Sequence, residues 1–271
     1  MIEQLRSASG RDIRLLCRDK TWTAPTAGLA LGYVQANLVI VPQVWAFEFL
    51  LFCYRNPRAC PLLEVTEPGC PEPRRCAPGA DLRTDLPRYC IFQNGQLVAE
   101  SLELHDFWRD DLVAFLLGCS FSFERALLRA GLPVRHVECQ CNVPMYKTNI
   151  PCEPAGRLHG SLVVSMRPLK PRQALEACQI CSRFPLAHGP PLHWGDPAEI
   201  GILDLTRPDF GDPVPIYPGE VPVFWACGVT SQTVLQESGV DFVITHKPGH
   251  MFLTDWRDED LARSQVNCYS F

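Results

Sequence analysis

The sequence lacks long hydrophobic runs and an excess of positive charge. No apolar segment approaches the roughly 20 residues that span a bilayer, so we expect no membrane partner. The chain has 25 Lys and Arg against 30 Asp and Glu, which gives a formal net charge of −5. Because a nucleic-acid-binding protein needs a basic face to neutralise phosphates, we also expect no nucleic-acid partner.

The sequence also lacks several well-known catalytic signatures. It contains no G-x-x-x-x-G-K-[ST], no G-x-G-x-x-G, no G-x-S-x-G and no H-E-x-x-H. No motif therefore indicates a P-loop, a dinucleotide-binding turn, a nucleophile elbow or a zinc-protease helix. Candidate sites have to be sought instead in polar clusters at the ends of strands and helices, where α/β sites tend to lie.

The first five residues, MIEQL, do not form a basic region followed by an apolar run, so we expect no secretory signal. We expect a cytoplasmic protein, with the mitochondrial matrix as the alternative. In such a reducing compartment the 14 cysteines stay free thiols. Only Cys178 and Cys181 have the spacing of a zinc-binding pair, and no second pair completes a site. We expect neither a metal nor a cofactor.

The 271 residues suffice for one large domain or two modest ones. A β-hairpin is predicted around Asn94 and Gly95, and Thr230 is expected to cap a short helix that ends at Gly239. Periodicity and end signals predict helices over 42–56, 108–117, 123–130, 171–183 and 255–262, and strands over 161–166, 221–226 and 241–246. The alternation favours a mixed α/β (α+β) fold, two-lobed, with mixed sheets flanked by helices.

A long connection suggests where the two lobes divide. Residues 135–156 show no periodicity and are rich in polar side chains, as functional or disordered loops are. We predict that residues 136–240 form a smaller α+β lobe. It would be inserted into a larger α/β lobe made of residues 1–135 and 241–271.

Two polar clusters follow or precede predicted strands. The segment THKPGHMFLTD contains His250 and Asp255, and a carboxylate beside an imidazole can fix its tautomer. The alternative is an ordinary turn histidine with Asp255 capping a helix. The segment MYKTNIPC contains Tyr146, Thr148 and Asn149, for which the alternative is a solvated loop.

Three further positions suit the binding of an acid. Arg167 ends an apolar strand, and its guanidinium could bind a carboxylate in bidentate fashion or form a structural ion pair. Segment 118–122 begins a helix at Ser120 or Ser122, where free N–H groups bind anions. Segment 226–230, with Cys227 and Thr230, is a similar strand-to-helix turn. A nucleophilic Cys119 would need a base that the sequence does not identify.

Ten long segments together resemble a hydro-lyase family that includes D-glutamate cyclase. They occur in the family's order and cover about residues 25–260, with small departures at Leu31 and in the Cys-Gln-Cys at 139–141. The segments are PTAGLALGYVQANLVIVP, FCYRNPRACPLLEVTEPG, DLRTDLPRY, WRDDLVAFLLGCSFSFE, NVPMYKTNIPC, VVSMRP, HWGDPAEIGI, RPDFGD, PGEVPVFWACGVT and THKPGHMFLTD.

The resemblance implies a two-lobed α and β structure and a carbon–oxygen lyase activity. The activity attached to the family is cyclisation of D-glutamate to 5-oxo-D-proline with loss of water. The implied partner is a small carboxylate or amino-acid substrate, and a homo-oligomer is left open.

That chemistry requires a base for the amine, donors for an oxyanion and a cation for the α-carboxylate. We assign Arg167 as the carboxylate anchor and His250, supported by Asp255, as acid and base. Glu67 is a further candidate carboxylate. The orienting donors are Tyr146, Thr148 and Asn149, and the oxyanion donors lie at Ser120 to Ser122 or near Cys227 to Thr230.

Two other functions fit the same residues. A non-catalytic protein that binds 5-oxoproline-like acids would need the same carboxylate contacts. A metal-dependent hydrolase or isomerase could use His246, His250 and Asp255 with His193 or Asp196 as additional ligands.

Overall fold

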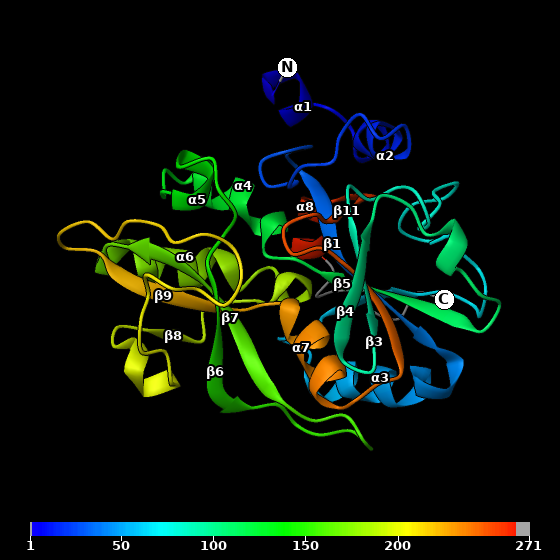
Figure 1. The fold of residues 1–271 in the computed structure, drawn as a ribbon. Coiled ribbons are helices and arrows are strands. Elements are labelled where there is room, and N and C mark those ends of the chain that lie inside the picture. Colours follow the sequence, from blue (N-terminus) through cyan, green and yellow to red (C-terminus); the bar gives the residue numbers. More distant parts are fainter. Residues whose placement is uncertain (1, 264–271) are drawn as a thin grey trace.

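The protein is described by a computed structural model that covers residues 2–263, and its largest sheet has seven strands (Figure 1). Six strands run in the order β2-β5-β1-β10-β3-β4, and β11 also pairs with β1. The strands are β1 (Tyr33–Pro42), β2 (Leu62–Val65), β3 (Tyr89–Gln93), β4 (Gln96–Ser101), β5 (Leu112–Gly118), β10 (Phe242–His246) and β11 (Phe252–Arg257).

A second sheet has four strands in the order β6-β7-β9-β8. These are β6 (Met145–Pro151), β7 (Ser161–Leu169), β8 (His193–Trp194) and β9 (Val221–Ala226). The predicted mixed α/β class is confirmed. Every strand pairing in the described part of the chain is antiparallel, so the sheets themselves are not mixed.

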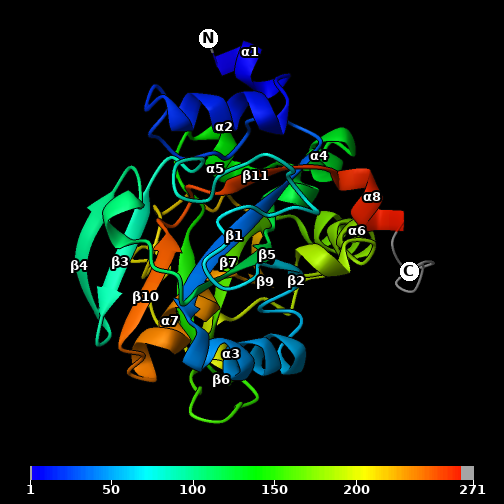
Figure 2. The same ribbon diagram turned by 90° about the vertical axis from the view of Figure 1, so that its right-hand side faces the viewer.

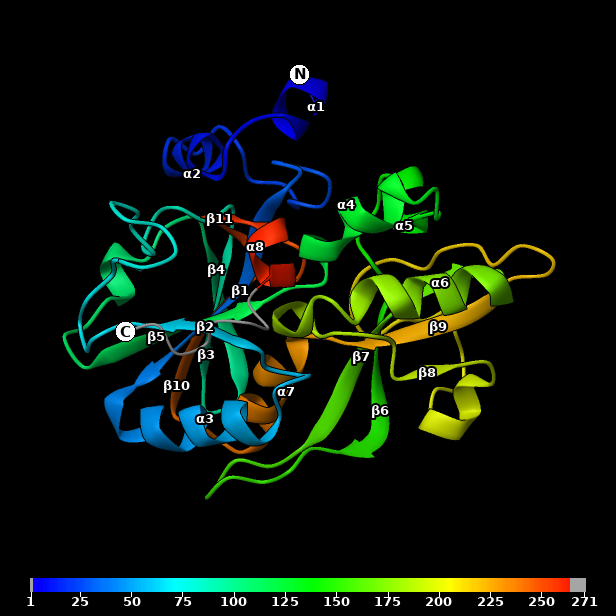
Figure 3. The ribbon, with the colours of Figure 1, turned by 180° about the vertical axis from the view of Figure 1, so that it is seen from behind.

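Helices cover the sheets from several sides. In the views of Figures 1 and 2, α3 and α7 lie below the first sheet, and α2 lies above it. Figure 3 shows α6 running along the second sheet. The α-helices are α1 (Ile2–Arg6), α2 (Gly10–Arg18), α3 (Gln43–Arg55), α4 (Phe121–Arg129), α5 (Arg135–Glu138), α6 (Pro171–Cys181), α7 (Val229–Glu237) and α8 (Asp258–Arg263). Short 3-10 turns are η1 (His105–Phe107), η2 (Pro185–Ala187) and η3 (Pro197–Ile200).

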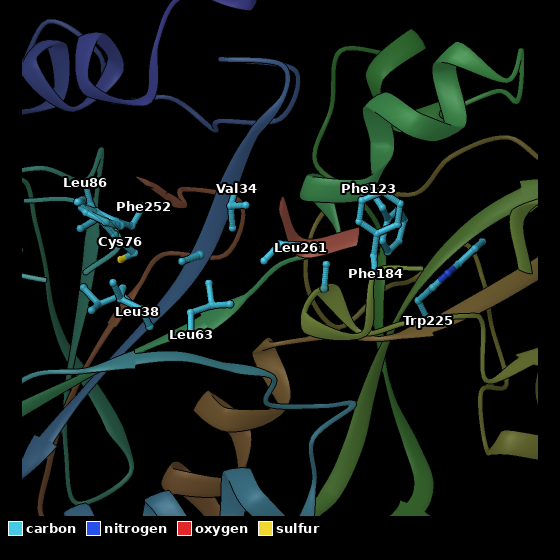
Figure 4. Packing of buried hydrophobic residues seen from close by; sticks show 14 of the residues in the cluster. Val34, Leu38, Leu63, Cys76, Leu86, Phe123, Phe184, Trp225, Phe252 and Leu261 are labelled. Atoms are coloured by element: carbon cyan, nitrogen blue, oxygen red, sulfur yellow. The ribbon is translucent and has the colours of Figure 1, made fainter. Parts of the chain in front are cut away.

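The hydrophobic core is continuous between the two sheets. One cluster joins Val34 and Leu38 of β1 to Phe123 of α4 and Trp225 of β9 (Figure 4). A second cluster, with α3 at its edge, likewise contains residues of β1, β5, β7 and β9. The two sheets are therefore packed against each other through shared apolar side chains, which is the main force that holds them together.

Several sequence-based predictions are confirmed. The predicted β-hairpin is present between β3 and β4. Its turn consists of Asn94 and Gly95, whose φ values of 48° and 77° suit a two-residue turn with left-handed residues. The predicted helices at 42–56 and 171–183 are α3 and α6, and the predicted helix at 123–130 is α4. The three predicted strands are β7, β9 and β10.

Residues 108–117 were expected to be helical, and this expectation is wrong. The segment Leu112–Gly118 is β5, which pairs with β1 on one side and β2 on the other, and all seven of its residues are buried. A short, continuous apolar run is compatible with a buried helix or a buried strand, and periodicity alone does not distinguish them. The two neighbouring strands decide the conformation.

Two other segments differ from expectation. Residues 135–156 contain α5 and β6 in place of one long loop. The last helix, α8, begins at Asp258, because Asp255 still belongs to β11. The helix α7 begins after Gly228, and Thr230 lies inside it. In the first turn Thr230 donates its hydroxyl hydrogen to Cys227 O (2.7 Å) instead of capping the helix.

The division into two lobes stays a proposal. It is supported by the sheets, since the strands of the first come from 33–118 and 242–257 and those of the second from 145–226. Residues 264–271 of the predicted larger lobe lie outside the described residues. Within the described part of the chain, no helix has the length and apolar character needed to cross a membrane.

Candidate active site at the junction of the two sheets

A buried arginine lies where the two sheets meet. Arg167 belongs to β7, and its side chain is 1% exposed. Its Nη2 donates to Glu124 Oε1 (2.5 Å) and Ser120 Oγ (3.0 Å), while Nη1 donates to Ser165 Oγ (3.2 Å). Its Nε has no hydrogen-bond partner among the residues that the structure describes. One N–H group of this cation is therefore still available.

Aromatic rings enclose the guanidinium. The Cζ atom of Arg167 lies 5.4 Å from the ring centre of Phe123 and 5.3 Å from that of Trp225. Ring faces attract a cation, and they also exclude water from it. A buried charge is tolerated only when it is paired, so Glu124 is a structural requirement for Arg167.

Glu124 also contacts a histidine. His136 Nε2, on α5, lies 3.0 Å from Glu124 Oε1, and both side chains are almost fully buried. Burial acts to raise the pKa of Glu124, but its interactions with His136 and Arg167 outweigh burial and hold that pKa below its ordinary value. The His136 ring stacks on Phe121 with the ring centres 5.9 Å apart. Arg167, Glu124 and His136 form a continuous buried polar chain.

His136 connects this chain to a surface cleft. It lines a cleft of about 360 Å³ together with Trp22, Pro25 and Leu29. Its Nδ1 has no hydrogen-bond partner within the described part of the chain. A second cleft of about 530 Å³, which His250 lines, adjoins the first, because Pro25, Asn142 and Asp212 line both. We call these two the junction clefts.

Two strand-to-helix turns lie beside Arg167. In one, β5 leads through Cys119 and Ser120 into α4, and in the other β9 leads through Cys227 and Gly228 into α7. Asn37 of β1 lies between them and donates from Nδ2 to Gly118 O (2.8 Å). A Cβ atom at Gly228 would overlap the Asn37 amide, so only glycine allows the two turns to approach this closely.

Both cysteines of these turns are buried. Burial raises the pKa of Cys227 to about 11 and raises that of Cys119 further above its usual range. The N–H groups of Phe121 and Val229, each the first residue of its helix, act in the opposite direction. Both thiols are therefore protonated at neutral pH in the ligand-free protein.

The sequence is similar to known proteins over most of its length. A model of the D-glutamate cyclase family matches residues 113–255. A protein of Geobacillus kaustophilus named "putative hydro-lyase" is 59% identical over 254 residues, 94% of this chain and 97% of that protein. Proteins with the same name from Stutzerimonas stutzeri and Bordetella pertussis are 58% and 57% identical over 95% and 94% of this chain and 97% and 92% of their own length.

The chain belongs to the D-glutamate cyclase family. The sequence-based resemblance is thus confirmed, and the names of the relatives agree with the predicted class of carbon–oxygen lyase. A solved nitrogen repressor-like protein of Methanococcus jannaschii matches 90% of this chain and 97% of its own with a TM-score of 0.39 and 9% identity.

The matched region of the D-glutamate cyclase family includes most of the junction. It contains Cys119, Glu124, His136, Arg167 and Cys227. Asn37 and Glu67 lie before it.

Some predicted site residues of this family member do lie together. Arg167, Ser120 and Cys227 belong to the junction, as described above. Ser122 Oγ accepts a hydrogen bond from the Gln35 N–H (3.1 Å) and thereby ties α4 to β1. Thr230 Oγ1 accepts from the Val163 N–H (3.0 Å), which ties α7 to β7. Ser120 stands at the N-cap position of α4, but neither its side chain nor that of Ser122 caps the helix, because both hydroxyl groups have these other partners.

The predicted donors of β6 lie elsewhere. Tyr146 donates to Leu205 O (2.8 Å) and Thr148 to Leu162 O (2.7 Å), so both hydroxyl groups are already used. Asn149 is exposed. The structure does not bring these three side chains to Arg167, and their role in orienting the substrate has no structural support.

The expected pair of His250 and Asp255 does not form. Asp255 lies in β11, where Arg14 Nη2 binds its carboxylate at 3.0 Å. His250 lines the second junction cleft and its Nδ1 contacts Pro248 O (3.1 Å), while burial lowers its pKa. Glu67 is exposed at the end of β2, and the carboxylate of that segment that is buried is Glu64.

The histidines that a metal-dependent enzyme would use as ligands have other contacts in the structure. His246 Nδ1 lies 3.2 Å from Leu38 N, and His193 Nε2 lies 2.8 Å from Asp196 O. In residues 2–263 no group of three or more His, Cys, Asp or Glu side chains is arranged to hold a metal ion.

Sequence reasoning missed Glu124, His136 and Asn37. An acidic residue in the first turn of a helix has an ordinary explanation in the helix dipole, so Glu124 attracts no attention. His136 stands alone in a segment for which the sequence predicts a loop. Only the packing of α4, α5 and β7 reveals that these side chains meet.

Proposed function

We propose that the protein cyclises an acidic amino acid at the junction clefts, with D-glutamate converted to 5-oxo-D-proline and water. The observation that carries this proposal is the buried chain of Arg167, Glu124 and His136, which ends at a cleft with an imidazole nitrogen that has no partner among the described residues. Family membership supports the reaction type.

The reaction must move two protons from the amine nitrogen to the departing oxygen. The imidazole of His136 can take the first proton from the substrate ammonium, because Glu124 beside it stabilises the imidazolium that results. The imidazolium can then deliver this proton to the γ-carboxyl oxygen. After the nitrogen has attacked, the regenerated imidazole can carry the second proton from that nitrogen to the departing hydroxyl group, which leaves as water. The nitrogen attacks the γ-carboxyl carbon, one C–N bond forms, one C–O bond breaks, and water is released.

In this proposal Arg167 cannot bind the substrate carboxylate in bidentate fashion, as the sequence had suggested. Glu124 already neutralises its charge, so a substrate carboxylate could reach only the free Nε–H. The N–H groups at the start of α4 and α7 are the further donors near this position. His250 in the adjoining cleft is a second candidate acid or base.

The test is incubation of the purified protein with D-glutamate, with chiral chromatography of the product. We expect 5-oxo-D-proline from the wild type and a loss of at least about 100-fold in His136→Asn, the range typical of a lost general base. His159→Asn is the matched control, because His159 is exposed and lines neither of the junction clefts. Binding of D-glutamate without any product would favour the non-catalytic carboxylate-binding protein and would contradict this proposal.

We further propose that the protein works in a reducing compartment, the cytoplasm or the mitochondrial matrix. The 13 cysteines within residues 2–263 are free thiols, and most of them are buried. Their free state is compatible with a compartment that keeps thiols reduced.

A further inference from the structure

Cys119 and Cys227 occupy equivalent positions in the two sheets. Each follows directly after a buried strand and stands two residues before the first residue of a nine-residue helix. In each case the N–H of that first helical residue, Phe121 or Val229, lies near enough to the sulfur to lower the pKa of the thiol. No other described cysteine stands directly before the start of a helix.

The two thiols lie close to each other. They belong to one small cluster of contacting buried side chains, with Met251 and Val163. Asn37 holds the two turns together, since its amide binds Gly118 O and lies against Gly228. The charge that Cys227 would carry raises the pKa of Cys119, which also places the two sulfurs near each other.

A buried cation completes the arrangement. The positive charge of Arg167 acts on both sulfur atoms and favours their deprotonated form. Its Nε–H is buried, has no hydrogen-bond partner among the described residues, and is free to bind an anion. The other groups that act on the pair are Glu124 on Cys119 and Cys60 on Cys227, and both oppose deprotonation. A carboxylate held by Arg167 and the helix starts would lie near both thiols.

We propose that Cys119 and Cys227 exchange the α-proton of the bound α-amino acid and thereby invert its configuration. One sulfur, as thiolate, removes the proton from Cα, and the electron pair of the C–H bond is delocalised into the carboxylate. The other sulfur, as thiol, donates its proton to the opposite face of Cα. The net change is inversion at Cα and transfer of one proton between the two sulfurs, with no oxidant or cofactor.

Arg167 and the helix N–H groups would stabilise the negative charge that develops on the carboxylate. The thiolate is a small fraction at neutral pH because burial raises the pKa of both cysteines, but a base of high pKa is correspondingly strong toward a weakly acidic carbon. The exchange should therefore accelerate as the pH rises from 7 toward 10.

This activity depends on one part of the proposed function, which is that the junction binds glutamate. The experiment is incubation of D-glutamate with the purified protein in ²H₂O. The enantiomers of glutamate and of 5-oxoproline are separated by chiral chromatography, and the deuterium content of each is measured by mass spectrometry. We expect L-glutamate that carries one deuteron at Cα, while the remaining D-glutamate stays protiated at early times, because the two faces are served by different sulfurs.

The variants Cys119→Ser and Cys227→Ser should each lower this inversion by at least about 100-fold, since a hydroxyl is a far weaker acid than a thiol. Cys17→Ser is the matched control, a buried thiol in α2 outside the junction, and should invert like the wild type. Circular dichroism on each variant verifies folding, and Cys119→Ala and Cys227→Ala provide a second pair if a serine variant does not fold.

The possible outcomes separate the two proposals. Lactam formation without any deuterium at Cα overturns the two-thiol proposal and leaves the cyclisation standing. Deuterated L-glutamate without any lactam overturns the cyclisation and leaves the two-thiol proposal standing. Deuterium that enters only the D form indicates a single base and contradicts the pair, and full inversion in both serine variants contradicts the assignment to these sulfurs.

Discussion

At the scale of single residues, the junction depends on one carboxylate. Glu124 binds both Arg167 and His136, and all three side chains are nearly inaccessible to water. Removal of one member of a buried ion pair leaves an uncompensated charge, which costs more than the pair contributes.

We predict that Glu124→Gln lowers the free energy of unfolding by about 3 kcal/mol, because Arg167 stays charged and loses its counter-ion. Urea unfolding followed by tryptophan fluorescence measures the change. The matched control is Glu237→Gln, which breaks the half-exposed ion pair with Lys147 and should cost less than about 1 kcal/mol. An equal effect in both variants would mean that Glu124 is not the essential partner of Arg167.

At the scale of secondary structure elements, β1 organises the site. Its flanking strands are β5 on one side and β10 with β11 on the other, and its Asn37 side chain reaches the starts of α4 and α7. This position explains why β5 is a strand although its sequence also permits a helix. The position of α7 relative to β1 depends on the absence of a side chain at Gly228.

We predict that Gly228→Ala displaces α7 or the Asn37 amide and lowers the product yield from D-glutamate at least tenfold. The backbone at Gly228 has φ −63°, which alanine adopts readily, so the expected effect comes from overlap alone. The double variant Asn37→Ala/Gly228→Ala removes the overlapping amide and should be less impaired than the sum of the two single variants. Strict additivity of the two substitutions would show that these residues do not interact.

At the scale of the whole molecule, the shared core buries histidines as neutral groups. Burial lowers the pKa of both His188 and His246 to about 4. Both pKa values lie below the unfolded value of about 6.5. The unfolded chain therefore binds more protons between these values, and stability is complete above pH 6.5 and falls as the pH drops toward 4.

We predict that each of these histidines lowers the free energy of unfolding by about 2 kcal/mol when the pH falls from 7.5 to 5. Urea unfolding of the wild type and His246→Gln at the two pH values measures the difference. The variant should lose less stability on acidification than the wild type, while His159→Gln, at an exposed position, should behave like the wild type. An identical pH dependence in all three proteins would contradict the buried neutral state of His246.

The sequence by itself determined the family, the enzyme class, the mixed α and β content and elements with strong local signals. The Asn94-Gly95 hairpin and α3 are examples, because turn chemistry and end signals act over a few residues. Local signals also singled out Arg167 and Cys227 as candidates.

Only the tertiary structure decided which residues surround Arg167. Its partner Glu124 is 43 positions away along the chain, and His136, which contacts Glu124, is 31 positions away. They meet because α4, α5 and β7 pack together. The same packing separates Asp255 from His250 and directs it to Arg14, 241 positions away. Hydrogen bonds and ion pairs act over a few ångströms in space, so their partners depend on how distant segments fold together.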